Sequence, residues 1–319
     1  MLEHKVSVLI PTYNATPFLE ATLLSVVTQI RNTDEIIVID DHSYDGSLEL
    51  AKEVLKHNHP NHIAEKNLNK GACSARNRAL ELSTGTLIQW LDADDILGKG
   101  KIDNQRQHLQ KDTACIAIAP FIPFAGTIES GIIQDNRTWP TKGEMSAASW
   151  LSKAFMTIPA CWLGHRTVFE AAGPWNTLLK INQDGEYFTR VLAQAETVLF
   201  DPAIEVYYRR NLSNSVSHFS ADKAESLYLS IASIHQTALG FEDSFRMRQM
   251  VANRYQHAIY SAYPHFPEGQ TKAQNQLKLL PPPTISNPNA LSPLSQIISQ
   301  VFGWKTLTRL RLLRKELFK

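Results

Sequence analysis

The sequence has little cysteine and no long apolar run. Its three cysteines, Cys73, Cys115 and Cys161, are far apart and form no Cys-x-x-Cys pair. This odd, scattered set argues against a disulfide framework or a zinc site, so we expect buried, reduced thiols. No apolar stretch approaches the roughly 20 residues that span a bilayer, and the N-terminus lacks a signal-peptide pattern. We therefore expect a cytoplasmic protein.

Neither sign of charge is in excess. The 319 residues include 32 Lys and Arg against 31 Asp and Glu, a net charge of +1. No overall field therefore favours nucleic acid, and we expect no such partner. Apolar residues make up 43% and charged residues 20%, which is typical of globular proteins. The length allows a main domain with an appendage.

The first hundred residues alternate between strand and helix patterns. Nearly continuous apolar runs at 6–10 and 35–39 predict buried parallel strands, and 62–64 and 86–91 predict two more. Helical patterns lie between them, at 16–29, 46–58 and 70–83, the first with Thr16 as its cap and Pro17 at its first position. The alternation predicts an α/β fold with an open, mostly parallel sheet flanked by helices.

After residue 112 the alternation weakens. We expect strands at 115–119, 197–200 and 204–208, helices at 146–155 and 184–195, and a loop-rich stretch at 120–143. Residues 221–263 show a helical pattern throughout, and the proline-rich stretch around 281–289 predicts a linker. The chain should therefore end in a helical extension.

Three carboxylates, Asp92, Asp94 and Asp95, directly follow the apolar run at 87–91. Clustered acids repel one another, so a fold that gathers them usually compensates with a cation, a hydrogen-bonding ligand or water. The alternative is an ordinary turn, because Asp caps helices and accepts backbone amides. Ligands of open α/β sheets bind beyond the carboxyl ends of strands. We expect the polar strand ends at 11–14 and 40–43 to converge with this one.

Five motifs in this order resemble glycosyltransferase family 2, which has a GT-A type fold. The resemblance covers residues 5–217, and its motifs lie at 6–14, 39–47, 67–77, 90–95 and 173–187. It implies an inverting enzyme that moves a sugar from a nucleotide-diphosphate sugar to a hydroxyl acceptor, in the synthesis of cell-surface polysaccharide or another glycoconjugate. Two positions depart from the family pattern: His42 replaces a glycine and Gln183 replaces a common glutamate.

The resemblance implies a nucleotide site at the strand ends. Pro11, Thr12 and Tyr13 would line the base and ribose, and Asp92 would contact the ribose. Asp41 would accept a hydrogen bond from the base edge, since an ionised carboxylate is only an acceptor. This is compatible with uracil, and we favour a UDP-sugar.

The resemblance also implies the groups that perform the transfer. Asp94 would hold a divalent cation, Mn²⁺ or Mg²⁺, that bridges the diphosphate. Lys70 and Arg76 would neutralise the diphosphate, although pairing with the nearby acids is the alternative for Arg76. Asp184 would be the catalytic base that takes the acceptor proton. Glu186 is the second candidate, or else a solvated acid of the first helical turn.

The sequence allows two roles for each of several further side chains. Asp95 is either a helix cap or a support of the cation site. Trp162 and Trp175 either stack on an acceptor sugar or belong to the core. The stretch 208–218 resembles a family loop that closes over the diphosphate, and His218 in it either touches metal or phosphate or is solvated.

The resemblance divides the chain into three parts. Residues 1–112 would bind the nucleotide sugar, 113–217 would bind the acceptor and complete the active site, and 218–319 would form the helical extension. The last segment, 304–319, is a basic amphipathic helix, which either lies on an anionic membrane or packs with a solvated basic face. The acceptor would be a hydroxyl-bearing glycan or a lipid-linked acceptor.

Two other functions fit the same fold. A nucleotidyltransferase that makes the sugar nucleotide usually carries a glycine-rich basic loop after the first strand, and residues 11–15 contain none. A non-catalytic module that binds nucleotide sugars is the second alternative, against which Asp41, Asp94 and Asp184 argue.

Overall fold

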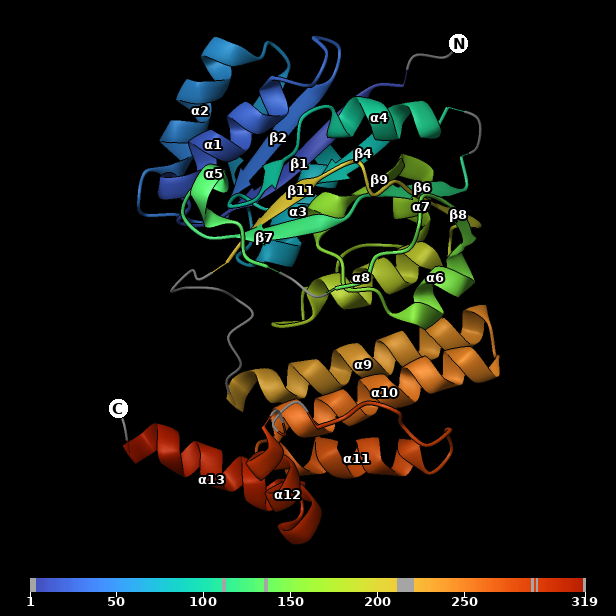
Figure 1. Ribbon diagram of the computed structural model, residues 1–319. Helices are drawn as coiled ribbons and strands as arrows, with labels where there is room; N and C mark the ends of the chain where they lie inside the picture. The colour runs from blue at the N-terminus through green and yellow to red at the C-terminus, as the bar shows by residue number, and fades with distance from the viewer. Residues whose placement is uncertain are drawn as a thin grey trace. The chain divides into compact units, whose positions relative to one another are not determined.

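The chain divides into two compact units (Figure 1). A computed structural model describes residues 4–110, 113–134, 137–210, 221–287, 290 and 292–317. The first unit comprises Met1–Leu178 and Gln183–Ser215, and the second comprises Leu179–Asn182 and Val216–Lys319. The finer boundary that we expect at residue 112 stays a prediction.

The first unit is built on an eight-stranded sheet in the order β3-β2-β1-β4-β9-β6-β10-β8. Four neighbouring strands are parallel: β1 (Val6–Thr12), β2 (Glu35–Asp40), β3 (His62–Lys66) and β4 (Leu87–Trp90). A second parallel pair consists of β6 (Cys115–Ile118) and β10 (Thr197–Phe200). Two strands are antiparallel to their neighbours: β9 (Trp162–His165) and β8 (Gly143–Ser146). The predicted mostly parallel α/β sheet is confirmed.

Helices flank this sheet, which is why its central strands are buried on both faces. All six residues of β2 are buried, and α3 packs against β1 and β2 while α4 packs against β6 and β9. The helices are α1 (Thr16–Val27), α2 (Ser47–Asn58), α3 (Ala72–Leu82), α4 (Lys101–His108), α5 (Ile128–Gly131), α6 (Ala147–Lys153), α7 (Arg166–Ala171) and α8 (Gln183–Leu192), with a 3₁₀ turn η1 (Pro159–Cys161).

The start of α1 differs from the prediction by one residue. Thr16 is its first helical residue and Ala15 takes the cap position, so Pro17 is the second helical residue. The Thr16 hydroxyl donates to the Asp45 carbonyl oxygen (2.9 Å) and does not cap its own helix. The three cysteines are buried, reduced thiols, as predicted.

A second, three-stranded sheet has the order β5-β11-β7. Its strands are β5 (Ile96–Leu97), β11 (Val206–Arg209) and β7 (Phe121–Phe124). The stretch 120–143, which we expect to be loop-rich, also contains β7 and α5. Pro123 lowered the strand signal of β7, and a proline is tolerated because β7 is an edge strand. β9 was not predicted either.

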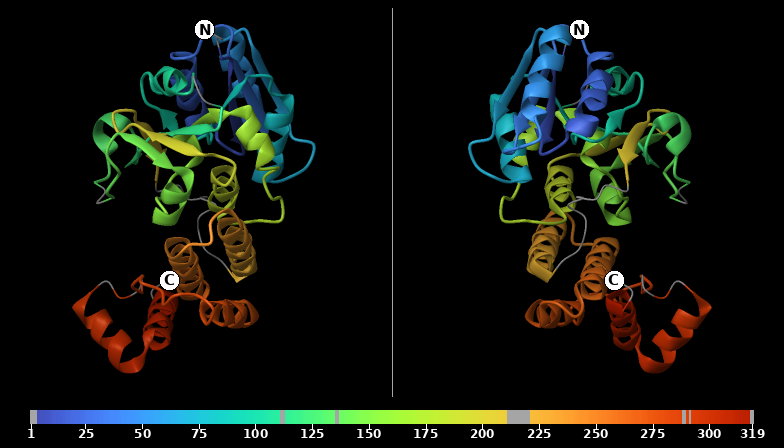
Figure 2. Two further views of the ribbon diagram at one scale, coloured as in Figure 1. Left: turned by 90° about the vertical axis from the view of Figure 1, so that its right-hand side faces the viewer. Right: turned by 90° about the vertical axis from the view of Figure 1, so that its left-hand side faces the viewer.

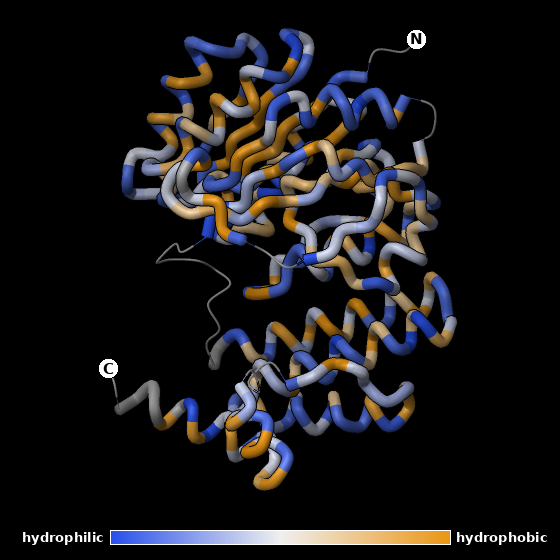
Figure 3. The backbone as a smooth tube through the Cα atoms, in the orientation of Figure 1, coloured by the Kyte–Doolittle hydropathy of each residue, from blue (hydrophilic) through white to orange (hydrophobic). Residues whose placement is uncertain are grey.

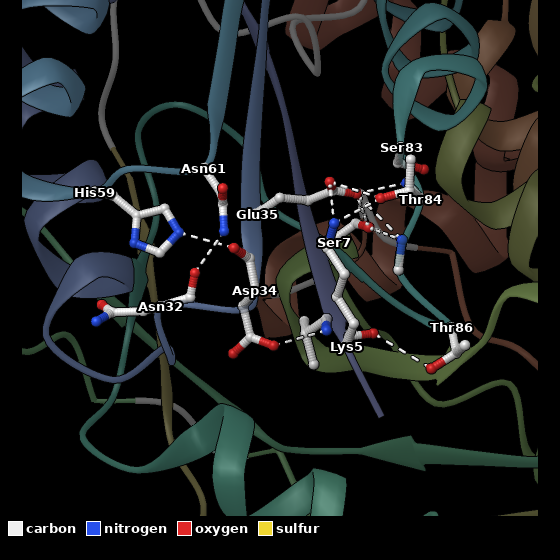
Figure 4. A network of polar contacts seen from close by, with 12 residues as sticks. Lys5, Ser7, Asn32, Asp34, Glu35, His59, Asn61, Ser83, Thr84 and Thr86 are labelled. Carbon is white, nitrogen blue, oxygen red and sulfur yellow. Dashed lines mark hydrogen bonds and ion pairs between the residues drawn. The ribbon is translucent and has the colours of Figure 1, made fainter. Parts of the chain in front are cut away.

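A polar network ties β1 and β2 to the turn before β4 (Figure 4). The Glu35 carboxylate accepts hydrogen bonds from Lys5 Nζ (2.7 Å), Ser7 Oγ (2.6 Å) and the Thr84 amide (2.5 Å). Gly85 adds its amide to the same carboxylate (3.1 Å). Glycine is needed there, since a Cβ would lie 2.4 Å from Ser7 Oγ and 2.7 Å from the Ser7 amide nitrogen.

The second unit is helical. It contains α9 (Ala221–Phe241), α10 (Phe245–Ala262), α11 (Pro267–Leu277), α12 (Pro293–Phe302) and α13 (Trp304–Leu317). The helical pattern at 221–263 is confirmed and consists of two helices, since Ser244 caps α10 by accepting the Met247 amide. Figure 2 shows α12 and α13, in red, meeting in a V. Among the described residues, no helix is long and apolar enough to cross a membrane.

Candidate active site

The polar ends of β1, β2 and β4 meet at one edge of the sheet, as expected. Thr12 pairs with Asp40 across β1 and β2, and the Leu91 amide after β4 donates to the Leu9 carbonyl oxygen of β1 (3.0 Å). The Asp41 amide in turn donates to the Thr12 carbonyl oxygen (2.7 Å). Parallel neighbours therefore bring these segments together. Tyr13, just beyond β1, is exposed.

Asp41 holds the loop before α3 against this edge. Its Oδ1 accepts hydrogen bonds from the Gly71 amide (2.8 Å) and Asn67 Nδ2 (3.0 Å), and its Oδ2 lies 2.9 Å from the same amide. Gly71 has a φ of 121°, which favours glycine. An ionised carboxylate offers about four acceptor sites, so these bonds leave capacity for a base edge. Lys70 precedes Gly71 and is exposed.

His42 keeps the backbone conformation that a glycine would adopt. Its φ is 66°, in the left-handed region that His and Asn enter more readily than most residues. The turn is supported on both sides: the Ser43 amide donates to Asp40 Oδ2 (3.0 Å) and the Tyr44 amide to Asn14 Oδ1 (3.1 Å). The departure from the family's glycine therefore leaves the turn intact.

Arg76 links the end of β4 to the start of α8. Its Nη2 donates to Asp92 Oδ1 (2.8 Å) and its Nη1 to Gln183 Oε1 (3.2 Å). The guanidinium also lies over the Trp175 ring, 4.5 Å from the ring centroid. Burial alone would lower the pKa of Arg76, but the charge and hydrogen bond of Asp92, together with the charges of Cys73 and Asp184, raise it above its usual value. The pairing with nearby acids does occur, and a contact of Arg76 with a diphosphate stays a prediction.

The other two carboxylates after β4 carry raised pKa values. Burial and then the neighbouring Asp92 charge raise the pKa of Asp94 to about 6. Burial and the charges of Asp94 and Asp92 hold the pKa of Asp95 well above its usual range. Burial works against both charged forms, so a cation beside these acids would be strongly favourable.

Asp95 is not a helix cap. The chain continues into the short strand β5, and α4 begins only at Lys101. Asp95 is fully buried, and its Oδ1 accepts the Arg209 amide of β11 (3.1 Å) while its Oδ2 has no hydrogen-bond partner. Asp95 therefore joins the acidic strand end to the small sheet.

Asp184 lies in the first turn of α8, directly after Gln183. Burial raises the pKa of Asp184, while the Gly185 amide and the Arg76 charge oppose the shift. A carboxyl group that holds its proton more tightly is a stronger base than an ordinary aspartate.

Glu186 is not a solvated acid. Its side chain is buried, and both oxygens bind the Arg190 guanidinium, at 2.8 Å to Nε and 2.9 Å to Nη2. The Arg190 guanidinium also donates to the Pro174 carbonyl oxygen (2.9 Å). The Glu186–Arg190 pair thus holds α8 against the segment around Trp175. Arg190 binds Glu186 and not Asp184, the other acid in this turn.

Arg209 and Asn77, to which the sequence assigned no role, also help to build this edge. Arg209 donates from Nε to the Asp94 carbonyl oxygen (3.0 Å) and from Nη1 to the Gly126 carbonyl oxygen (2.7 Å). Asn77 pairs with the Trp175 backbone in both directions, donating to its carbonyl oxygen (3.0 Å) and accepting its amide (2.8 Å). Local sequence patterns do not indicate these contacts, so only the structure could assign the two residues their roles.

A model of the family described as "Glycosyl transferase family 2" matches residues 7–173. The chain belongs to this family. It is 33% identical over 116 residues to the putative teichuronic acid biosynthesis glycosyltransferase TuaG of Bacillus subtilis, which covers 36% of this chain and 46% of TuaG. It is 41% identical over 92 residues to the uncharacterized glycosyltransferase YibD of Escherichia coli, covering 29% of this chain and 26% of YibD. The chain thus spans less than half of either relative.

Among solved structures, S. aureus TarS residues 1–349 in complex with UDP-GlcNAc superpose with a TM-score of 0.68 at 18% identity, covering 95% of this chain and 90% of that one. At this identity the likeness shows a shared fold.

The two tryptophans that could have stacked on an acceptor sugar, Trp162 and Trp175, are buried in this family 2 chain and are not available to one. Trp162 and Trp175 are each 1% exposed. Trp162 stacks on Phe188 (centroids 4.2 Å apart) and Trp175 on Tyr187 (4.0 Å). They therefore belong to the core, and Trp175 supports Arg76 from below. His218 and the rest of 211–220 lie outside the described residues.

The carboxylates after β4 fit a divalent cation that takes only one or two of its ligands from the protein. No group of three or more His, Cys, Asp or Glu side chains within the described ranges could cage a metal ion. The Asp92 carboxylate is paired with Arg76, whereas the pKa of Asp94 is raised to about 6. Mg²⁺ and Mn²⁺ often bind one carboxylate together with phosphate oxygens and waters, and such a site needs no cage.

Proposed function

We propose that this protein is an inverting glycosyltransferase that moves a sugar from a nucleotide-diphosphate sugar to a hydroxyl acceptor. The observation that carries the proposal is the bridge made by Arg76, which joins Asp92 to the residue preceding Asp184. This bridge supports the assignment of Asp92 and Asp184, which are 92 positions apart in the sequence, to one site, and neither a turn nor a helix cap would require it.

Asp184 is the proposed base. Inversion requires a proton acceptor on the face of the sugar opposite the leaving diphosphate, and the acceptor hydroxyl must lose its proton as the new bond forms. The raised pKa of Asp184 makes its carboxylate a better proton acceptor. Asp184 also sits on a rigid helical turn, which suits a group that must be held in place.

Pro11, Thr12, Tyr13 and Asp41 are proposed to bind the nucleoside, with Asp92 at the ribose. The Asp41 carboxylate is oriented by the Gly71 amide and Asn67, which would fix its remaining acceptor positions. Lys70 and Arg76 would face the diphosphate as positive groups. TarS has been solved with UDP-GlcNAc, and this supports a UDP-sugar as the donor tested first.

A divalent cation, Mn²⁺ or Mg²⁺, is proposed to be held by Asp94. When bound, it would neutralise charge on the departing diphosphate. Three acids, Asp92, Asp94 and Asp95, gather at this strand end, and the raised pKa values of Asp94 and Asp95 support a positive partner there.

The proposed acceptor is a hydroxyl group of a glycan or a lipid-linked sugar in cell-surface polysaccharide or glycoconjugate synthesis. The name of TuaG, a teichuronic acid biosynthesis glycosyltransferase, supports this class. A peripheral contact of residues 304–319 with an anionic membrane on the cytoplasmic side would bring the enzyme to such acceptors.

A donor panel tests the proposal. Purified protein is heated with UDP-, GDP- and dTDP-sugars, with and without Mn²⁺, and the same mixtures are assayed for released nucleotide diphosphate. We expect one donor to raise the melting temperature in a metal-dependent way and to be turned over slowly with water as acceptor. Formation of sugar nucleotide from a sugar phosphate and a nucleoside triphosphate would favour a nucleotidyltransferase instead. Binding with no turnover by any acceptor tried would favour the non-catalytic module.

A further inference from the structure

Four large apolar side chains of α12 face outward, whereas Ile298 is half-buried. Leu294, Ile297, Val301 and Phe302 are 67%, 56%, 67% and 67% exposed, and the first three are spaced three and four residues apart along one face of the helix. The residue of α12 that is buried is a serine, Ser295. An ordinary surface helix turns its apolar face inward, so α12 has the reverse arrangement. Figure 3 shows the orange, hydrophobic segments along α12.

The adjoining turns of α13 add basic and apolar groups. Lys305 and Arg309 are exposed, as is Leu310 at 49%, whereas Leu307 is buried. Trp304 anchors this end of α13 within the unit, with its ring 5.1 Å from those of Tyr260 and Tyr263. The start of α13 is thus fixed while its cations reach solvent.

Charge is distributed unevenly along the chain. Residues 269–319 contain eight Lys and Arg but a single acid, Glu316, whereas residues 1–268 contain 24 Lys and Arg and 30 Asp and Glu. The net charge of +1 therefore hides a basic C-terminal part. α12 itself carries no charged side chain. An uncharged apolar stripe beside a cluster of cations complements an anionic membrane surface, in which acyl chains lie below acidic headgroups.

We propose that α12 and the start of α13 form a membrane-docking surface for anionic bilayers, made of Leu294, Ile297, Val301, Phe302, Lys305 and Arg309. α12 lies in the interface with its apolar stripe at the level of the upper acyl chains, and the α13 cations face the acidic headgroups. This docking surface deepens the proposed contact through 304–319 and rests on it. In this proposal α12, which carries no basic residue, is the helix that inserts into the membrane interface.

Vesicle sedimentation tests the docking surface with the full chain. The probes are vesicles of phosphatidylcholine alone and vesicles that contain 30% phosphatidylglycerol, at low and at physiological salt. We expect binding to the anionic vesicles only. The double variant Ile297→Ser/Val301→Ser should lower the bound fraction roughly tenfold or more, although it removes no charge. Lys305→Glu/Arg309→Glu should lower it by a similar factor, with a smaller dependence on salt.

Matched controls lie elsewhere on the surface. Phe245→Ser removes an aromatic that is 73% exposed at the start of α10, and Lys52→Glu/Lys56→Glu reverses two exposed charges of α2. Both should bind like the unchanged protein. Circular dichroism checks that each variant is folded, which substitution of outward-facing residues should not prevent.

Three results would overturn the docking surface. One is equal binding to both kinds of vesicle, and another is unchanged binding by Ile297→Ser/Val301→Ser. The third is a change from dimer to monomer in that variant with vesicle binding retained, which would make the stripe a self-association surface. Donor turnover in the same preparations separates this proposal from the enzymatic one. An inactive protein that still binds vesicles contradicts only the proposed function, and an active protein that does not bind contradicts only the docking surface.

Discussion

Arg76 donates a hydrogen bond to Asp92 at 2.8 Å, and this ion pair joins the motif at 67–77 to the motif at 90–95. The same guanidinium reaches Gln183 at 3.2 Å and rests on the Trp175 ring. A planar, forked cation can make these three contacts at once, whereas an ammonium group cannot. The geometry of the edge therefore depends on arginine and not only on positive charge.

We expect Arg76→Lys to lower the transfer rate by about 10- to 100-fold and the free energy of unfolding by about 1–2 kcal/mol, because the fork to Asp92 and Gln183 is lost. Urea denaturation and a donor turnover assay measure the two effects. Arg78→Lys is the matched control on the same helix, where Arg78 pairs with Glu65 and with Glu81 at the surface. If Arg76→Lys behaved like that control, the bridge would have no role.

Asp184→Asn should abolish proton removal while keeping the shape of the side chain. We expect kcat to fall by about 10³-fold, within the usual range for a lost general base, and the donor-induced thermal shift to persist. The exposed Glu170→Gln serves as the control acid. Near-normal transfer by a folded Asp184→Asn variant would remove Asp184 from the chemistry. Loss of donor binding together with kcat would instead indicate a role in holding the donor.

Asp94→Asn should separate stability from function. Burial and the charge of Asp92 disfavour the ionised Asp94, so its neutral isostere should raise the free energy of unfolding of the ligand-free protein by about 1 kcal/mol. The Mn²⁺-dependent part of the donor-induced thermal shift should disappear in the same variant. Calorimetry with and without Mn²⁺ and donor reports both. A variant that kept the metal-dependent shift would exclude Asp94 as the main cation ligand.

The sheet was predictable where strands are long and apolar on both faces. Nearly continuous apolar runs at 6–10 and 35–39 predict β1 and β2. The polar residues that follow these runs lie at the carboxyl edge because the two strands are parallel. β9 and β7 were missed because they are four residues long and contain a glycine or a proline. Such short strands are specified by their neighbours across the sheet.

The site was predictable only as a set of residue types. The motifs brought attention to Asp92, Asp184 and Arg76, but local patterns contain no information on contacts over 107 positions such as that of Arg76 with Gln183. For the same reason Asp95 looked like a helix cap and Glu186 like a solvated acid. Asp95 accepts the Arg209 amide, which is a tertiary contact with a strand far along the chain. Glu186 binds Arg190 of its own helix, but the sequence does not show that this face of the helix is buried.

α12 was missed for a different reason. Its ten residues follow a proline-rich stretch and its apolar stripe faces outward, so the pattern gives no inward face around which to predict packing.

The Glu35 network should make stability depend on pH in the acid range. Burial alone would raise the pKa of Glu35, but hydrogen bonds from Lys5, Ser7 and Thr84 outweigh it and lower the pKa from 4.5 to about 2. The folded state thus binds the proton less readily than the unfolded state. The resulting stabilisation is complete above the unfolded pKa of 4.5 and is lost as the pH falls towards 2.

We therefore expect Glu35→Gln to lower the free energy of unfolding by about 2 kcal/mol at pH 7. The difference from the unchanged protein should shrink progressively below pH 4.5, because protonation then removes the same charge from Glu35 itself. Urea denaturation followed by circular dichroism at pH 7, 5.5, 4 and 3 measures the trend, with the surface acid variant Glu49→Gln as the control. A difference that stayed constant down to pH 3 would mean that the charge of Glu35 does not stabilise the junction of β1, β2 and the turn before β4. The difference would then come from the shape and the neutral hydrogen bonds of the carboxyl group, which glutamine does not fully reproduce.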